Sequence, residues 1–98
     1  MLFLVTLVHP PDLCLARKEY YDIGKQWFDD MKESARKLNV KVHGSYVCPI
    51  EHTFYLLIES DNFKAVSGFL GPPMLTHHSA KITPLITVDD AYETIKPK

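Results

Sequence analysis

The stretch VKVHGSYVCPIEHTFYLLIE, residues 40–59, decides the fold. Its first part, Val40–Cys48, alternates apolar and polar residues, and its last part, Glu51–Glu59, is rich in aromatic and branched apolar residues. Both patterns are typical of β-strands. Pro49 and Ile50 lie between them, where the chain has to turn. We therefore predict a β-hairpin.

A strand and a helix precede this hairpin. Leu2–Val8 (LFLVTLV) is a continuous apolar run, which favours a buried central strand. In Arg17–Leu38 the apolar residues recur every three or four positions, as in an amphipathic helix. Asn39 follows as a C-terminal cap.

A second helix and strand follow the hairpin. We predict a short helix that is capped by Ser60 or Asp61 and stopped by Gly71-Pro72-Pro73, and then a loop over Met74–His78. A strand over Ala80–Thr87 follows, and a closing helix over Val88–Ile95 is capped by Thr87. Pro84 lies inside the last strand and cannot donate a ladder hydrogen bond, so this strand is expected at an edge of the sheet.

The resulting order is strand, helix, strand, strand, helix, strand, which is the ferredoxin-like βαββαβ pattern. Right-handed crossovers then place the strands in the spatial order four, one, three, two. We therefore predict one α+β domain over residues 1–98, with a four-stranded antiparallel sheet and two helices on one face. The competing arrangement is an open meander with the helices elsewhere.

The first and third strands are apolar on both faces, whereas two helices cover only one face of a sheet. In the first strand, Leu2, Leu4 and Val8 lie on one face and Phe3, Val5 and Leu7 on the other. An uncovered apolar face usually marks an interface. We predict that two copies pack these faces together as a homodimer. The alternative is that the C-terminal segment folds across the sheet.

Composition excludes several classes of function. The formal net charge of −1 gives no basic excess for nucleic acid, and no apolar run is long enough to cross a membrane. Two cysteines are too few for a disulfide scaffold, and the apolar start lacks the features of a signal peptide. We therefore expect a cytoplasmic protein with reduced thiols.

Four of the five histidines fall at one edge of the predicted sheet, where strands one and two end and strands three and four begin. They are His9, His52, His77 and His78, and Cys48 ends strand two nearby. Imidazole is the commonest transition-metal ligand, and a thiolate can complete its shell. We therefore predict a site for a transition metal such as zinc, although the chain has no compact ligand motif. The alternative is that these histidines are ordinary polar residues at strand ends.

A second hypothesis is a site for a small, partly aromatic molecule. His43, Tyr46 and Tyr55 lie within the hairpin strands, and histidine is able to act as a general base. With a two-residue turn, His43 shares one face with His52 and Phe54, while the two tyrosines share the other. The alternative is that these tyrosines only pack against neighbouring side chains.

Three segments, LFLVTLVHPP, HGSYVCPIEHTFYLLIESDNF and FLGPPMLTHHSAKITPLIT, resemble those of small proteins in the dimeric α+β barrel group, with EHTFY and GPPMLTHH as the shared motifs. The resemblance covers most of the chain. It implies a ferredoxin-like protomer and a homodimer. Members of that group include cofactor-independent monooxygenases, muconolactone-isomerase-like enzymes, haem-binding proteins and ligand sensors, but no catalytic motif of these maps onto this chain.

Three functions follow as hypotheses. The preferred one is a small dimeric domain that binds a transition metal or a small ligand at the histidine-rich edge of the sheet. The second is a small cofactor-independent enzyme, of monooxygenase or isomerase type, acting on an aromatic or lactone-like substrate. The third is a dimerisation or regulatory module without chemistry.

Overall fold

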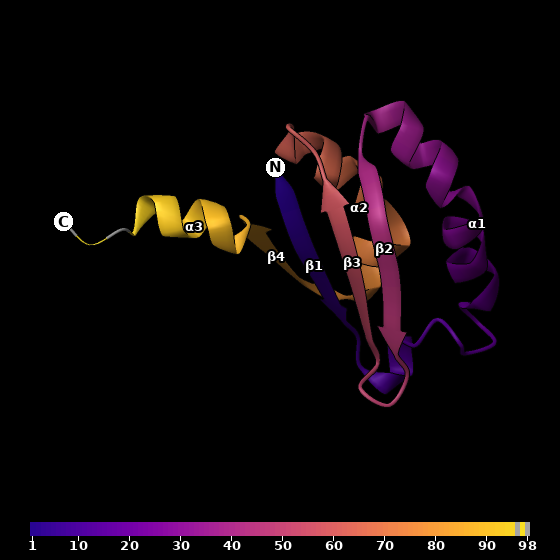
Figure 1. Ribbon diagram of the computed structural model, residues 1–98. Coiled ribbons are helices and arrows are strands. Elements are labelled where there is room, and N and C mark those ends of the chain that lie inside the picture. Colours follow the sequence, from indigo (N-terminus) through magenta and orange to yellow (C-terminus); the bar gives the residue numbers. More distant parts are fainter. Residues whose placement is uncertain (96, 98) are drawn as a thin grey trace.

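The computed structural model describes residues 1–95 and 97 and has an α+β architecture (Figure 1). Its elements are β1 (Leu2–Val8), the 3-10 helix η1 (Pro11–Leu13), α1 (Tyr21–Leu38), β2 (Lys41–Cys48), β3 (Thr53–Glu59), α2 (Phe63–His77), β4 (Ser79–Leu85) and α3 (Val88–Thr94). The strands form one antiparallel sheet in the order β2-β3-β1-β4. The predicted ferredoxin-like arrangement and strand order are therefore confirmed, and Pro84 lies on an edge strand as expected.

The main core lies between the sheet and the helices α1 and α2. The sheet contributes the buried side chains Phe3, Val5, Leu7, Leu56 and Ile58, and α2 contributes Val66, Phe69, Leu70 and Met74. Each of these strand residues alternates with one that faces the other way, so the burial pattern of β1 follows the period of two expected of a strand.

We call the other side of the sheet the open face. Its side chains include Leu2, Leu4, Val8, Tyr46, Tyr55, Leu57 and Leu85, which alternate with the core positions. In this face Leu4 of β1 pairs with Leu57 of β3. The C-terminal segment does not fold across it, because α3 extends away from the sheet beyond β4 (Figure 1).

Three elements begin later than the sequence indicated, and one of them is β2, which begins at Lys41 rather than Val40. The first long helix begins at Tyr21 rather than Arg17, because the preceding residues form successive turns that carry Leu15 into the core. The third strand begins at Thr53 rather than Glu51, because His52 has a φ of 50°, in the left-handed region. The β2–β3 turn is consequently longer than two residues.

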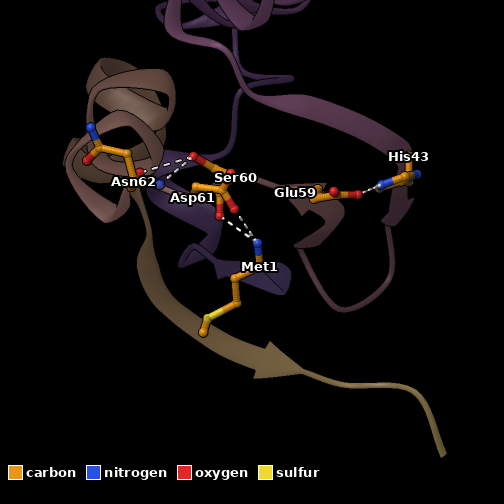
Figure 2. A network of polar contacts seen from close by, with 6 residues as sticks. All are labelled: Met1, His43, Glu59, Ser60, Asp61 and Asn62. Carbon is orange, nitrogen blue, oxygen red and sulfur yellow. Dashed lines mark hydrogen bonds and ion pairs between the residues drawn. The ribbon is translucent and has the colours of Figure 1, made fainter. Parts of the chain in front are cut away.

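The N-terminus of α2 also differs from the prediction. Its cap is Asn62, not Ser60 or Asp61, since the Asn62 side chain accepts hydrogen bonds from the backbone N–H groups of the first turn. Ser60 and Asp61 have other roles (Figure 2). The Ser60 hydroxyl accepts from the Asn62 N–H at 3.1 Å, and the Asp61 carboxylate contacts the Met1 ammonium at 3.2 Å.

The Gly71-Pro72-Pro73 segment kinks α2 but does not end it. Gly71 has a φ of 40°, and Pro72 is extended, so the helix breaks at this point. It resumes at Pro73, a residue suited to the first turn of a helix. The predicted loop over Met74–His78 is therefore helical as far as His77, and this turn buries Met74 in the core.

The last strand and the last helix agree with the prediction in type but not at every boundary, since β4 begins at Ser79 rather than Ala80 and α3 ends at Thr94 rather than Ile95. Strand β4 ends at Leu85 rather than Thr87, because the Thr87 side chain instead accepts a hydrogen bond from the Asp90 N–H and caps α3. The predicted closing helix is thus confirmed. The predicted C-terminal cap of α1 is also confirmed, since Asn39 has the left-handed φ of 56°.

Candidate metal centre

One end of the sheet brings together three side chains with metal-binding atoms, His9, Cys14 and His52. Their candidate ligand atoms all lie within 4.8 Å of one another. In a tetrahedral zinc site, neighbouring ligand atoms are about 3.5 Å apart, from metal–ligand bonds of about 2.0–2.3 Å. Small rotations of these side chains would therefore close the group around one ion.

The strand pairing fixes two members of this group. Val8 pairs with Thr53, so the residues just beyond them, His9 and His52, lie opposite each other at the end of β1 and the start of β3. The His9 N–H donates to the His52 carbonyl at 3.2 Å, and the two imidazole rings are 5.2 Å apart between centroids.

The third member is positioned by the chain's return after β1. The Leu13 N–H donates to the Pro10 carbonyl at 3.0 Å, which closes a tight turn around η1. Leu15 then anchors the chain in the core, and Cys14 lies between the turn and the anchor. The Ala16 N–H donates to the Cys14 sulfur at 3.5 Å.

A chain of hydrogen bonds determines the tautomer of His9. The Nδ1 of His78 lies 2.9 Å from the Met74 carbonyl, which only accepts, so this nitrogen carries the proton. The neutral His78 ring therefore presents a bare Nε2, and the Nδ1 of His9, 2.9 Å away, donates to it. It follows that the Nε2 of His9 carries a lone pair and no proton.

This Nε2 of His9 is buried and has no hydrogen-bond partner in the part of the chain that the structure describes. The residue is only 5% exposed. Buried polar atoms in proteins almost always have a partner, and an exception calls for an explanation such as an ion. The arrangement also matches that of metal-binding histidines, in which the second ring nitrogen donates to a neighbouring group that orients the ring.

The surroundings of His9 and His78 favour the neutral form of both imidazoles. Burial lowers the pKa of His9, and the neighbouring rings of His78, His52 and His77 lower it further. Burial also lowers the pKa of His78, against the opposing effect of its hydrogen bonds to backbone carbonyls. Because only the neutral ring can ligate a metal, both shifts extend the pH range in which His9 is ready to bind.

The structure brings some of the five predicted metal ligands together and keeps the others apart. It brings together His9 and His52, and it adds His78 as the hydrogen-bond partner of His9. His77 points elsewhere, with its Nδ1 3.3 Å from the Leu13 carbonyl and its ring against Tyr20. Cys48 is outside the group.

Strand alternation explains the position of Cys48 and the omission of Cys14. Cys48 pairs with Thr53 and faces the open side, whereas His9 continues the buried series of β1 and lies on the core side. Cys14 was not among the predicted ligands. The consecutive prolines Pro10 and Pro11, which return the chain toward the sheet, were the signal that could have indicated it.

The three residues of the predicted ligand site all belong to the open face. Tyr46 pairs with Tyr55, and the Tyr46 ring lies over Gly44, where an added Cβ would be 2.7 Å from a ring carbon. A β-bulge between Val42 and Gly44 turns His43 toward Glu59, and their side chains meet at 2.8 Å (Figure 2). His43 is therefore not on the face of Phe54. A ligand site here stays a prediction.

A hollow between α1 and α2 lies elsewhere. It has a volume of about 510 Å³ and is lined by residues that include Trp27, Phe69 and His77. None of the three metal-binding side chains reaches it. The candidate metal centre is thus a compact group of side chains rather than part of a deep pocket.

Comparison with known proteins places the whole chain in one family. The family model described as a domain of unknown function (DUF3303) matches residues 1–98. No curated protein matches the chain significantly. Among the residues that the structure describes, no helix combines the length and the apolar character needed to cross a membrane.

Proposed function

The chain belongs to the DUF3303 family, and we propose that it binds a divalent transition-metal ion, with zinc as the first candidate, through His9, Cys14 and His52. The observation that carries this proposal is the buried, unprotonated and unpartnered Nε2 of His9, which lies beside a thiol and a second imidazole. The neutral tautomer chain from Met74 through His78 supports it, because it holds the His9 ring in the metal-binding form.

Two imidazoles and one thiolate suit zinc, which prefers nitrogen and sulfur ligands in a tetrahedral shell. Cys14 and His52 are only half-buried, so a fourth position would be open to water or to a small ligand. When bound there, zinc would act as a Lewis acid on that ligand. A cytoplasmic location belongs to the same proposal, because a ligating Cys14 has to stay reduced.

The test is a metal titration of protein produced without a histidine tag and stripped with a chelator. We expect one equivalent of Co²⁺ to bind with a thiolate-to-cobalt charge-transfer absorption, and one equivalent of Zn²⁺ to displace it. The Cys14→Ser variant should lose this absorption and bind Zn²⁺ at least tenfold more weakly. The Cys48→Ser variant is the matched control and should titrate like the wild type.

Two results would overturn the metal proposal. One is the absence of stoichiometric Co²⁺ or Zn²⁺ binding by folded wild-type protein. The other is equal Zn²⁺ affinity of the Cys14→Ser and Cys48→Ser variants, since binding would then not use the Cys14 sulfur. Circular dichroism of both variants ensures that the comparison is made between folded proteins.

We also propose that the chain forms a homodimer through its open face. The apolar pair Leu4 and Leu57 lies at the centre of that face, with Leu2 and Leu85 beside it, and neither α1 nor α2 covers them. Apolar patches of this kind on a sheet usually mark an interface. A second copy presents the same patch and is its simplest complement.

Light scattering at micromolar concentration tests the homodimer. The wild type should have the mass of two chains, and Leu57→Lys should have the mass of one, because an unpaired lysine at the centre of the interface cannot be solvated. Ser67→Lys, at an exposed position of α2, is the control and should remain a dimer. A wild-type monomer would refute the proposal.

A further inference from the structure

We infer that α3 is an exchanged arm, which packs its apolar side against the β2 edge of the open face of a second copy. The inference rests on the homodimer proposed above. It adds a contact that packing of the two sheet centres does not require, because α3 lies outside the sheet. It also identifies which part of the chain that contact uses.

The side chains of α3 form an amphipathic stripe that the chain's own body leaves bare. Val88, Tyr92 and Ile95 recur at intervals of four and three residues, which puts them on one side of the helix. They are 70%, 65% and 69% exposed. The opposite side carries Asp89, Asp90 and Glu93. A stripe of this kind is the signature of a helix that packs on another surface.

The rest of the described chain does not supply that surface. Between residues 1 and 95, α3 packs extensively against none of the other elements, and it extends away from the end of β4 (Figure 1). The radius of gyration is 15.2 Å, whereas a compact chain of about this length has about 13 Å. An isolated helix of two turns is marginal in water, so an external contact has to stabilise α3.

The β2 edge of the open face has the complementary properties. Tyr46 of this strand is 66% exposed and lies on the open face. Lys41 lies on the same face of the same strand, since it pairs with Glu59. An arm whose apolar side covers the Tyr46 ring would bring its acidic side near Lys41. This match of apolar and charged groups favours the β2 edge of a second copy as the surface on which α3 packs.

The short connection between β4 and α3 favours exchange over folding back. Only Ile86 and Thr87 separate the two elements, and Thr87 has extended backbone angles, so α3 leads away from its own strand. Strand β2 of the same chain is the far edge of the sheet, with β1 and β3 in between. The β2 edge of a second copy has no such constraint.

Disulfide trapping tests the arm directly. In a Cys14→Ser/Cys48→Ser background, one chain carries Tyr92→Cys and another carries Tyr46→Cys, and the two are mixed and oxidised. We expect a covalent dimer that forms only in the mixture and whose linked peptides contain both new cysteines. Glu93→Cys, on the acidic side of α3, is the matched control and should cross-link at least fivefold less.

Three outcomes of the trapping would overturn the inference. They are no covalent dimer in the mixture, equal yields from Tyr92→Cys and Glu93→Cys, and a disulfide that forms only within a single chain carrying both Tyr92→Cys and Tyr46→Cys. The last of these would mean that the arm folds onto its own sheet.

The dissociation constant of the dimer tests the arm separately from the homodimer. We expect Tyr92→Asp to raise the dissociation constant of the dimer at least tenfold, whereas Glu93→Gln leaves it within threefold of the wild type. If the wild type is dimeric and Tyr92→Asp dissociates no more readily, the arm is refuted and the homodimer stands. If the wild type is a monomer, both are refuted.

Discussion

His78 shows how a residue outside the ligand set can control a metal site. Its Nδ1 donates to Met74 and its Nε2 accepts from His9, so it sets both the tautomer and the ring orientation of the proposed ligand. Its ring also lies 5.6 Å from that of Phe54, measured between centroids, which holds it in place. Replacing a residue with this role typically lowers metal affinity about 10- to 100-fold.

We predict that His78→Leu weakens Zn²⁺ binding about 10- to 100-fold although it changes no ligand. The Nδ1–H of His9 would lose its acceptor, and its ring would be free to turn. Competition with a chromophoric chelator measures the affinity. His43→Ala is the control, because His43 lies on the open face, and its Zn²⁺ affinity should equal that of the wild type. Equal affinities for all three proteins would contradict the assigned role.

The position of Cys14 depends on how closely α1 approaches the segment before it. Gly24 lies in the second turn of α1, and a Cβ at that position would be 2.9 Å from the Cβ of Leu15. This contact requires glycine, because the Cβ of Leu15 is attached directly to the backbone and the Leu15 side chain is buried, so Leu15 cannot move aside. Because Leu15 follows Cys14 directly, the helix fixes the sulfur through this contact.

We predict opposite effects of the same substitution at two helical glycines. Gly24→Ala should lower the free energy of unfolding by about 1–3 kcal/mol, because it forces Leu15 out of position, and it should also weaken Zn²⁺ binding. Gly68→Ala should raise the free energy of unfolding by about 0.5–1 kcal/mol, since its Cβ meets only Leu38 Cδ1 at 3.8 Å. Urea denaturation with chelator present measures both, and a stabilising Gly24→Ala would disprove the contact.

The stability of the whole molecule is linked to protons through its buried histidines. The pKa values of His9 and His78 lie below their ordinary value in the folded protein, whereas unfolding restores them to about 6.5. Below about pH 6.5 the unfolded chain therefore binds more protons than the folded one. The free energy of unfolding therefore has its full value above about pH 6.5, and it decreases as the pH falls toward the pKa values that His9 and His78 have in the folded protein.

We predict that the metal-free protein loses stability between pH 7.5 and pH 5.5. The slope should reach at most about 1.4 kcal/mol per pH unit for each of the two histidines. Urea denaturation at each pH, with chelator present, measures it. A His9→Leu/His78→Leu variant should show a flatter profile. A wild-type profile as flat as that of the double variant would contradict the linkage.

The sequence by itself determined the elements and their order, because these depend on local periodicity. The apolar run of β1, the hairpin and Pro84 on an edge strand were sufficient for the strand order. The same order predicted that His9 and His52 meet at one edge. Boundaries set by long-range contacts were missed, as at the start of α1, where burial of Leu15 overrides the helical pattern.

Only the tertiary structure decided which side chains complete the candidate site. The alternation of β2 and the length of its turn send Cys48 to the open face, and the return of the chain after Pro10 and Pro11 brings Cys14 to the core side instead. The sequence could not show that His78 supports His9 while His77 points away, because this depends on the extra helical turn after the kink in α2. A ligand set is defined by distances in space, and those depend on how the elements pack.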